Sequence, residues 1–150
     1  AIADNPAFAI SRIEVDRPGA SYAVDTLEAL AAEERASGRE PDLTFILSVE
    51  AFRELPSWRE PRRLLALCRM AVVPRGGARA PGRAWLAEHL PGQEDRIAFL
   101  DGPQIRLSAS QVRERVAAGR SIRYLVPPPV AAYIAEHHLY ESDSWRKNRP

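Results

Sequence analysis

The chain has 150 residues, of which 45% are hydrophobic, and this is enough for one globular domain with a buried core. Its 21 Lys and Arg residues against 20 Asp and Glu residues give a net charge of +1, which excludes the strong positive field typical of nucleic-acid-binding proteins. There is no stretch typical of a signal peptide, no apolar run of 18 residues and only one cysteine, Cys68. We therefore expect a soluble, cytoplasmic protein without disulfides or a membrane partner.

The first part of the chain predicts strands separated by a helix. Residues 9–15 alternate apolar and polar side chains, which predicts a strand, and Asp16-Arg17-Pro18-Gly19 predicts a turn after it. Apolar residues at helical spacing predict a helix over 21–37, and Gly38 is placed to end it. The short apolar run at 43–47 predicts a buried parallel strand.

The rest of the chain continues this alternation. The expected elements are a helix over 50–55, a helix over 61–67, a strand over 70–73, a helix over 83–90, strands over 97–100 and 105–107, and helices over 109–118 and 128–139. Such alternation implies a parallel α/β sheet, in which ligands bind beyond the carboxyl ends of the strands. Ser48, Arg75 and Ser108 each follow a predicted strand, so we expect them at one edge of the sheet.

Segment 107–113, Leu-Ser-Ala-Ser-Gln-Val-Arg, has the layout of a phosphate site. Ser108 can be the N-cap of a helix, with Gln111 at capping-box spacing. The first N–H groups of a helix have no intrahelical acceptor and attract anions. Ser110 can add a hydroxyl donor, and the guanidinium of Arg113 can bind phosphate oxygens in a bidentate manner. The alternative is that Ser108 caps an ordinary surface helix and Arg113 is solvated.

Five ordered segments carry a resemblance to a known family. Residues 107–113 resemble the Ile-Ser-Ser-Thr-x-x-Arg motif of bacterial nicotinate-nucleotide adenylyltransferases, with three replacements. The other similar segments are 13–19, 21–27, 55–58 and 72–75. The resemblance covers about residues 5–140. It implies the C-terminal portion of a nucleotidyltransferase-type α/β domain over residues 1–140, followed by a disordered polar tail over 141–150.

The implied fold is a Rossmann-like parallel sheet with flanking helices, without the first strands of the family. The implied reaction transfers AMP from ATP to nicotinate mononucleotide, which gives deamido-NAD and pyrophosphate in NAD biosynthesis. By resemblance, Ser108, Ser110 and Arg113 bind the ATP phosphates, and Arg113 is the catalytic cation. Ser48 and Glu50 stand where the family has a Gly-x-Asp that meets the ribose hydroxyls. No His, Cys or carboxylate cluster has metal-site spacing, so the expected metal is Mg²⁺ carried by ATP.

The same resemblance implies a pocket for the nicotinate nucleotide. Trp58 would stack on the pyridine ring, for which a flat aromatic face is suited. The helix start from Tyr22 to Thr26 would receive the carboxylate, and Arg75 would also contact this nucleotide. Ala23 stands where the family usually has Thr, so one hydroxyl contact is lost. The alternative for Trp58 is a tryptophan packed under a loop.

Three functions remain open at this point. The first is a nicotinate-nucleotide adenylyltransferase chain that is inactive alone, because the glycine-rich turn and the His-x-Gly-His motif of the family have no counterpart here. The second is a non-catalytic nucleotide-binding module, favoured by Ala23, Ser48 and Glu50. The third is an adenylyltransferase for another phosphorylated substrate, such as phosphopantetheine. An incomplete sheet would leave strand edges uncovered, so we also expect homo-oligomers.

Overall fold

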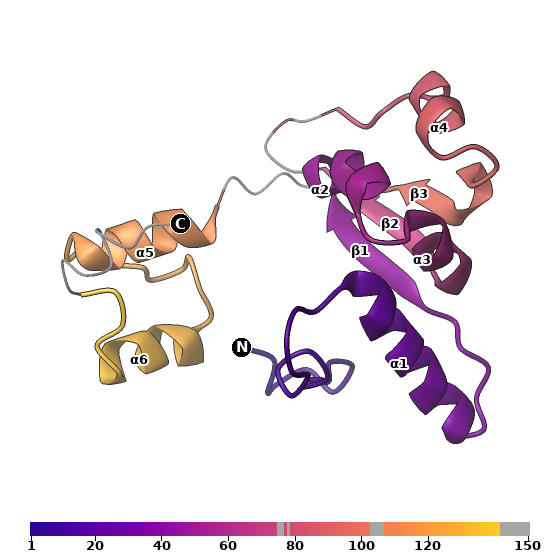
Figure 1. Cartoon of the computed structure of the whole chain (residues 1–150). Coiled ribbons are helices and arrows are strands. Elements are labelled where there is room, and N and C mark those ends of the chain that lie inside the picture. The colour runs from indigo at the N-terminus through magenta and orange to yellow at the C-terminus, as the bar shows by residue number, and fades with distance from the viewer. Residues whose placement is uncertain (75–76, 78, 103–106, 142–150) are drawn as a thin grey trace. The chain divides into compact units, whose positions relative to one another are not determined.

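The computed structural model describes residues 1–74, 77, 79–102 and 107–141. The chain forms two compact units (Figure 1). Residues 11–105 make up the first, which we call the sheet unit. Residues 1–10 together with 106–150 make up the second, which we call the helix-pair unit.

A parallel sheet of three strands is the centre of the sheet unit. Its strands are β1 (Thr44–Ser48), β2 (Arg69–Val73) and β3 (Ile97–Phe99), in the order β1-β2-β3. Each pair of neighbours is parallel, and Ser48 is in register with Val73. The carboxyl ends of β1 and β2 therefore lie side by side, as the α/β prediction requires.

The helices of the sheet unit begin and end close to the predicted positions. They are α1 (Ala23–Ala36), α2 (Val49–Glu54), α3 (Pro61–Leu67) and α4 (Arg83–His89), with 3₁₀ turns η1 (Leu55–Ser57) and η2 (Glu94–Arg96). Gly38 ends the α1 segment with φ +75°, a left-handed conformation that glycine adopts without strain. Pro61 opens α3 at a first-turn position, where its missing N–H costs no hydrogen bond.

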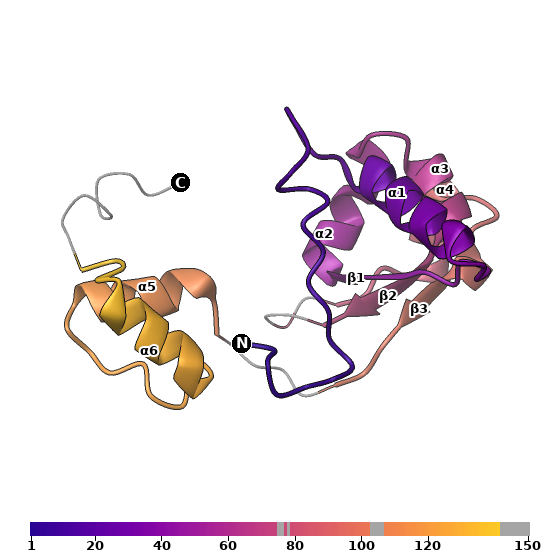
Figure 2. The ribbon, with the colours of Figure 1, turned by 90° about the horizontal axis from the view of Figure 1, so that it is seen from below.

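One face of the sheet carries the core. Figure 2 shows α1 to α4 together on one side of the strands. Side chains alternate between the two faces of a strand, and Leu47 and Val72 point to the side of these helices. Phe52 of α2 is 0% exposed and packs there against Phe99 of β3. On the other face, Ile46 is 69% exposed. Within the described part of the sheet unit, no helix covers this second face.

The strand predicted over residues 9–15 is wrong. The structure has turns and irregular backbone there, and none of the described strands lies in this segment. Asp16 N–H donates to the Arg12 carbonyl at 2.9 Å, and the two side chains form an ion pair at 2.7 Å. Ile10 and Val15 are 79% and 74% exposed, so the alternation of apolar residues has no sheet on which to be buried. A strand needs a partner, and alternation alone does not provide one.

The helix-pair unit contains α5 (Ala109–Ala117) and α6 (Pro128–Glu136), both close to their predicted ranges. Val112, Ile122 and Ile134 are its buried residues, and together they hold α5, the connecting segment and α6 in one small core. The strand predicted over 105–107 falls largely outside the described residues, as does the tail from residue 142 onward. None of the helices in the described ranges combines the length and apolar character needed to cross a bilayer.

Candidate functional site

The predicted phosphate segment folds as a capped helix start. Ser108 is the N-cap of α5 in extended conformation, and its Oγ accepts from the Gln111 N–H at 3.2 Å. The Gln111 side chain accepts from the Ser108 N–H at 2.8 Å, which completes the capping box. Between them, Ala109 and Ser110 occupy the first two helical positions, where helix geometry supplies no intrahelical acceptor for the N–H groups. The positive end of α5 is thus ordered before any ligand arrives.

Arg113 lies about one turn into α5 and is held toward the helix start. Its Nη2 donates to the Ser110 Oγ at 3.3 Å, and both side chains are half-buried. This contact orients the guanidinium and places a hydroxyl and a cation on one side of α5. The three residues predicted to bind ATP phosphates in this segment, Ser108, Ser110 and Arg113, are therefore neighbours in the structure.

Ser48 and Glu50 lie where β1 passes directly into α2. Ser48 is both the last residue of β1 and the N-cap of α2, and its Oγ accepts from the Ala51 N–H at 3.3 Å. The Ser48 side chain thus stabilises the helix start, which is a structural use of a residue predicted to bind nucleotide. Glu50 is exposed in the first turn of α2, where a carboxylate is favoured by the helix dipole.

The start of α1 is tied to the loop before it. Thr26 Oγ1 donates to the Glu14 carboxylate at 2.7 Å and accepts from Arg17 Nη1 at 3.2 Å. Tyr22 is the N-cap of α1 but makes no side-chain capping bond, and Ala23 is the first helical residue. The Thr26 hydroxyl, predicted to help form the nicotinate pocket, is thus already satisfied within the protein. Glu14 and Arg17 were not among the predicted site residues.

Trp58 follows the η1 turn and is half-buried beside the core. Its ring meets Phe45 of β1 edge-to-face, with centroids 6.0 Å apart. The next residue, Arg59, places its guanidinium 4.6 Å from the centroid of the Tyr22 ring and 4.0 Å from the Asp25 carboxylate. Arg59 thereby joins the Trp58 segment to the start of α1. Sequence reasoning missed Arg59, because its contact with Tyr22 joins two segments that only the fold brings together.

The predicted site residues therefore form two groups. Tyr22, Ala23, Thr26 and Trp58 belong to the sheet unit together with Ser48 and Glu50, whereas Ser108, Ser110 and Arg113 belong to the helix-pair unit. Arg75 lies outside the described residues. Among the residues that the structure describes, no three His, Cys, Asp or Glu side chains are grouped as ligands for a metal ion. Cys68 is 2% exposed, and its burial raises the pKa of the thiol, which fits an inert core residue.

Comparison with known proteins identifies relatives along almost the whole chain. A protein of Roseiflexus sp. (strain RS-1) is 46% identical over 140 residues, which are 93% of this chain and 67% of the relative. A protein of Symbiobacterium thermophilum is 43% identical over 143 residues, with 93% and 66% covered. Both are named "Probable nicotinate-nucleotide adenylyltransferase". The chain thus spans about two thirds of the length of these relatives. No model of a protein family matches the chain.

Solved structures show the same fold. Nicotinic acid mononucleotide adenylyltransferase of Plasmodium falciparum, complexed with APC, aligns with a TM-score of 0.55 at 17% identity and covers 77% of this chain and 58% of that protein. Its complex with NaAD gives the same TM-score and identity, with 77% and 57% covered. The parallel sheet and its flanking helices are thus of the kind found in these enzymes. With the sequence identity to the bacterial proteins, this shows that the chain belongs to the nicotinate-nucleotide adenylyltransferase family.

Proposed function

We propose that this chain carries the nucleotide-binding part of an enzyme that transfers AMP from ATP to nicotinate mononucleotide in NAD biosynthesis. The observation that carries the proposal is 46% identity to a named bacterial relative over 93% of the chain. The capped start of α5 adds support, since the segment that resembles the family motif forms a helix N-terminus there, and such termini are suited to binding anions. Because the chain spans about two thirds of its relatives, the activity of the whole protein is part of this proposal.

The reaction needs two substrates held in line and charge neutralised on the leaving group. An oxygen of the nicotinate mononucleotide phosphate attacks the α-phosphorus of ATP, a P–O bond forms, and the bond to the β-phosphate oxygen breaks to release pyrophosphate. The Ser108 hydroxyl, the Ser110 hydroxyl and the N–H groups at the start of α5 would donate to phosphate oxygens. Arg113 would neutralise charge that develops on the departing pyrophosphate.

A metal ion enters this proposal only with the substrate. The described residues provide no cluster of carboxylates, histidines or cysteines for a resident ion, and the α5 start provides hydroxyl and N–H donors together with a guanidinium. These groups bind anions and do not replace the oxygen ligands that Mg²⁺ prefers. In this proposal the substrate is MgATP.

The start of α1 and Trp58 are our candidates for the pyridine nucleotide. The Trp58 indole is half-buried against Phe45, which leaves part of the ring system for stacking on an aromatic ligand. Two cations lie near the α1 start, since Arg17 contacts Thr26 and Arg59 lies over Tyr22. These cations would attract a carboxylate on the pyridine ring. The Glu14 carboxylate competes with it, because it already accepts the hydrogen bond from the Thr26 hydroxyl. Because Arg59 also contacts the carboxylates of Asp25 at 4.0 Å and Glu60 at 3.8 Å, this arrangement by itself does not favour nicotinate over nicotinamide.

The second face of the sheet, which no described helix of the sheet unit covers, supports one proposal about assembly. Ile46 is 69% exposed in the middle of β1, and parallel sheets are normally covered on both faces. We propose that copies of the chain associate through this face. Light scattering on the wild type and on Ile46→Lys tests this, and equal masses for the two would contradict it.

The function is tested by mixing the chain with MgATP and nicotinate mononucleotide and measuring pyrophosphate release and deamido-NAD formation. Nicotinamide mononucleotide and phosphopantetheine replace the second substrate in parallel reactions. Formation of deamido-NAD supports the proposal. Release with phosphopantetheine alone would assign a different substrate. Binding of both nucleotides without release would assign the chain as a nucleotide-binding module, which the departures at Ala23, Ser48 and Glu50 favour.

A further inference from the structure

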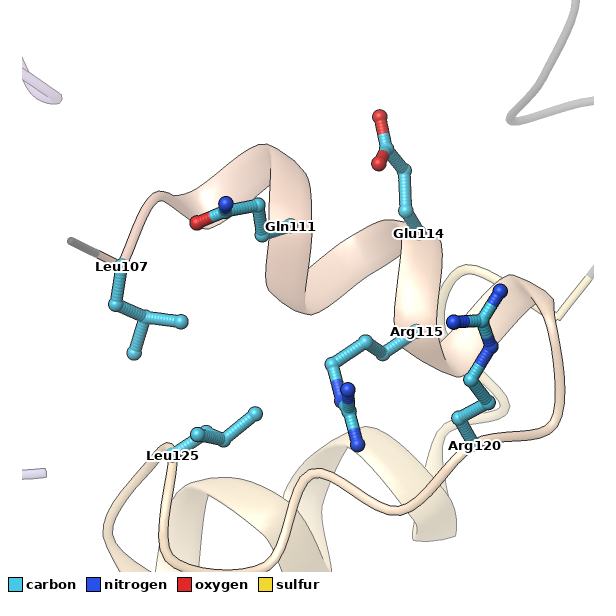
Figure 3. Close-up of a pocket in the computed structure, with 6 residues that line it drawn as sticks. All are labelled: Leu107, Gln111, Glu114, Arg115, Arg120 and Leu125. Atoms are coloured by element: carbon cyan, nitrogen blue, oxygen red, sulfur yellow. The ribbon is translucent and has the colours of Figure 1, made fainter.

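A second candidate anion site lies on the helix-pair unit. It is a cavity of about 360 Å³ lined by six residues from α5 and from the segments before and after it (Figure 3). The lining residues are Leu107, Gln111, Glu114, Arg115, Arg120 and Leu125. Ser108, Ser110 and Arg113 are not among them. The cavity therefore shares Gln111 with the α5 capping box but is lined by none of the three residues proposed to bind the ATP phosphates.

The way α5 ends brings the backbones of Arg115 and Arg120 together, whereas Figure 3 shows their guanidinium groups pointing in different directions. Gly119 has φ +65°, its N–H donates to the Val116 carbonyl at 2.9 Å, and the Arg120 N–H donates to the Arg115 carbonyl at 2.8 Å. These two bonds define a Schellman motif, in which the residue after the glycine lies against the helix residue five positions earlier. Proteins usually place an apolar pair at these two positions. Here both residues are arginines.

The Arg115 side chain is fixed in this position. Its Nε donates to the Ser121 carbonyl at 2.9 Å, which immobilises the guanidinium while its Nη groups keep further donor capacity. Figure 3 shows the Arg115 guanidinium reaching toward the space that Leu107 and Leu125 also face, with the Glu114 carboxylate drawn well away from it. The cavity thus combines an oriented cation with an apolar wall.

The charges and the shape of the cavity indicate one class of ligand. Two guanidinium groups and one carboxylate line the cavity, so the formal charge of the lining is +1 (2 − 1). The alternative is that the arginines are there because the carboxyl-terminal end of the α5 dipole attracts cations. That attraction does not explain the hydrogen bond from Arg115 Nε to the Ser121 carbonyl or the presence of Leu107 and Leu125 in the lining. Two guanidinium groups are suited to a dianionic phosphate, and a volume of about 360 Å³ fits a small molecule. We propose that the cavity binds a small phosphate monoester, with the oxyanion at Arg115 and Arg120 and the apolar part on Leu107 and Leu125.

Phenyl phosphate is the probe, titrated into the full chain by calorimetry. The variants Arg115→Gln and Arg120→Gln should each weaken binding by about tenfold or more, which is the scale for a lost hydrogen bond to a charged group. Arg123→Gln is the matched control, because Arg123 belongs to the same unit but lies over the Tyr124 ring at 5.0 Å and does not line this cavity. Inorganic phosphate should bind more weakly than phenyl phosphate, since it has no group for the leucine wall.

Two further variants separate this cavity from the start of α5 and from misfolding. Arg120→Gln should weaken phenyl phosphate binding more than Arg113→Ala does, and circular dichroism should show the Arg120→Gln variant folded as the wild type. The proposal would be overturned by the absence of saturable binding at millimolar probe. It would also be overturned if Arg113→Ala weakened binding while Arg120→Gln did not, or if Arg123→Gln weakened it as much as Arg120→Gln.

Discussion

The double use of Ser108 yields a prediction that separates stability from binding. Its hydroxyl accepts from the Gln111 N–H at 3.2 Å, so Ser108→Ala removes the N-cap of α5. Loss of a serine N-cap costs about 1 kcal/mol, whereas glycine at the same position costs only a few tenths of a kcal/mol. Ser108→Gly therefore deletes the hydroxyl while it keeps most of the helix stability. Ser108→Ala and Ser108→Gly therefore differ in the stability of the α5 start, but both lose the same contact with phosphate.

Hydrogen exchange of the α5 amides measures the first effect, and calorimetry with ATP measures the second. Ser108→Ala should lower the protection of the α5 amides by about fivefold, the equivalent of 1 kcal/mol, and Ser108→Gly should lower it by much less. Both variants should lose ATP affinity by about 1.5 kcal/mol or more, the value for a hydrogen bond to a charged group. Gln111→Ala serves as the control, because it removes the other half of the capping box and leaves the serine hydroxyl in place.

Two results would show that the Ser108 hydroxyl does not contact phosphate. If Ser108→Gly binds ATP as tightly as the wild type, the hydroxyl only caps the helix and does not contact phosphate. If Gln111→Ala loses as much ATP affinity as Ser108→Gly, the loss reflects the order of the α5 start, and no direct contact needs to be invoked.

Three further predictions follow from burial and ring contacts. Leu47 is 7% exposed and Ile46 is 69% exposed. In urea denaturation at high dilution, Leu47→Ala should therefore lower the free energy of unfolding of the monomer by about 2–5 kcal/mol, and Ile46→Ala should lower it by about 0.5 kcal/mol or less. Equal losses would contradict a core on only one face of the sheet. Burial raises the pKa of the Cys68 thiol, so iodoacetamide should label the chain at neutral pH only after denaturation, and rapid labelling of the folded chain would show that the thiol is accessible. Nicotinate mononucleotide should quench tryptophan fluorescence in a Trp85→Phe variant but not in Trp58→Phe; quenching that survives in Trp58→Phe would place the ligand elsewhere.

Local signals in the sequence were sufficient for most of the secondary structure. Gly38 and Pro61 mark helix boundaries through backbone conformation alone, and the structure places them as predicted. The capping box of Ser108 and Gln111 depends only on residues three apart, so it too could be predicted. Such features depend on residues close in the sequence and not on tertiary contacts.

Features that depend on a distant partner could not be predicted in the same way. The apolar alternation over 9–15 predicted a strand, but the described structure provides no strand to pair with it. The hydrogen bond from the Thr26 hydroxyl to the Glu14 carboxylate joins residues 12 positions apart. The contact of Arg59 with Tyr22 joins two different elements. Each depends on tertiary packing, which local pattern does not encode.

We propose that the start of α5 binds the phosphates of ATP through Arg113. The most direct test is calorimetric titration of MgATP into the wild-type chain and into Arg113→Ala, with Arg123→Gln as the control for loss of one positive charge in the same unit. Arg113→Ala should weaken ATP binding by about 1.5–3 kcal/mol, and Arg123→Gln should have little effect. Equal ATP affinity in the wild type and in Arg113→Ala would contradict this proposal.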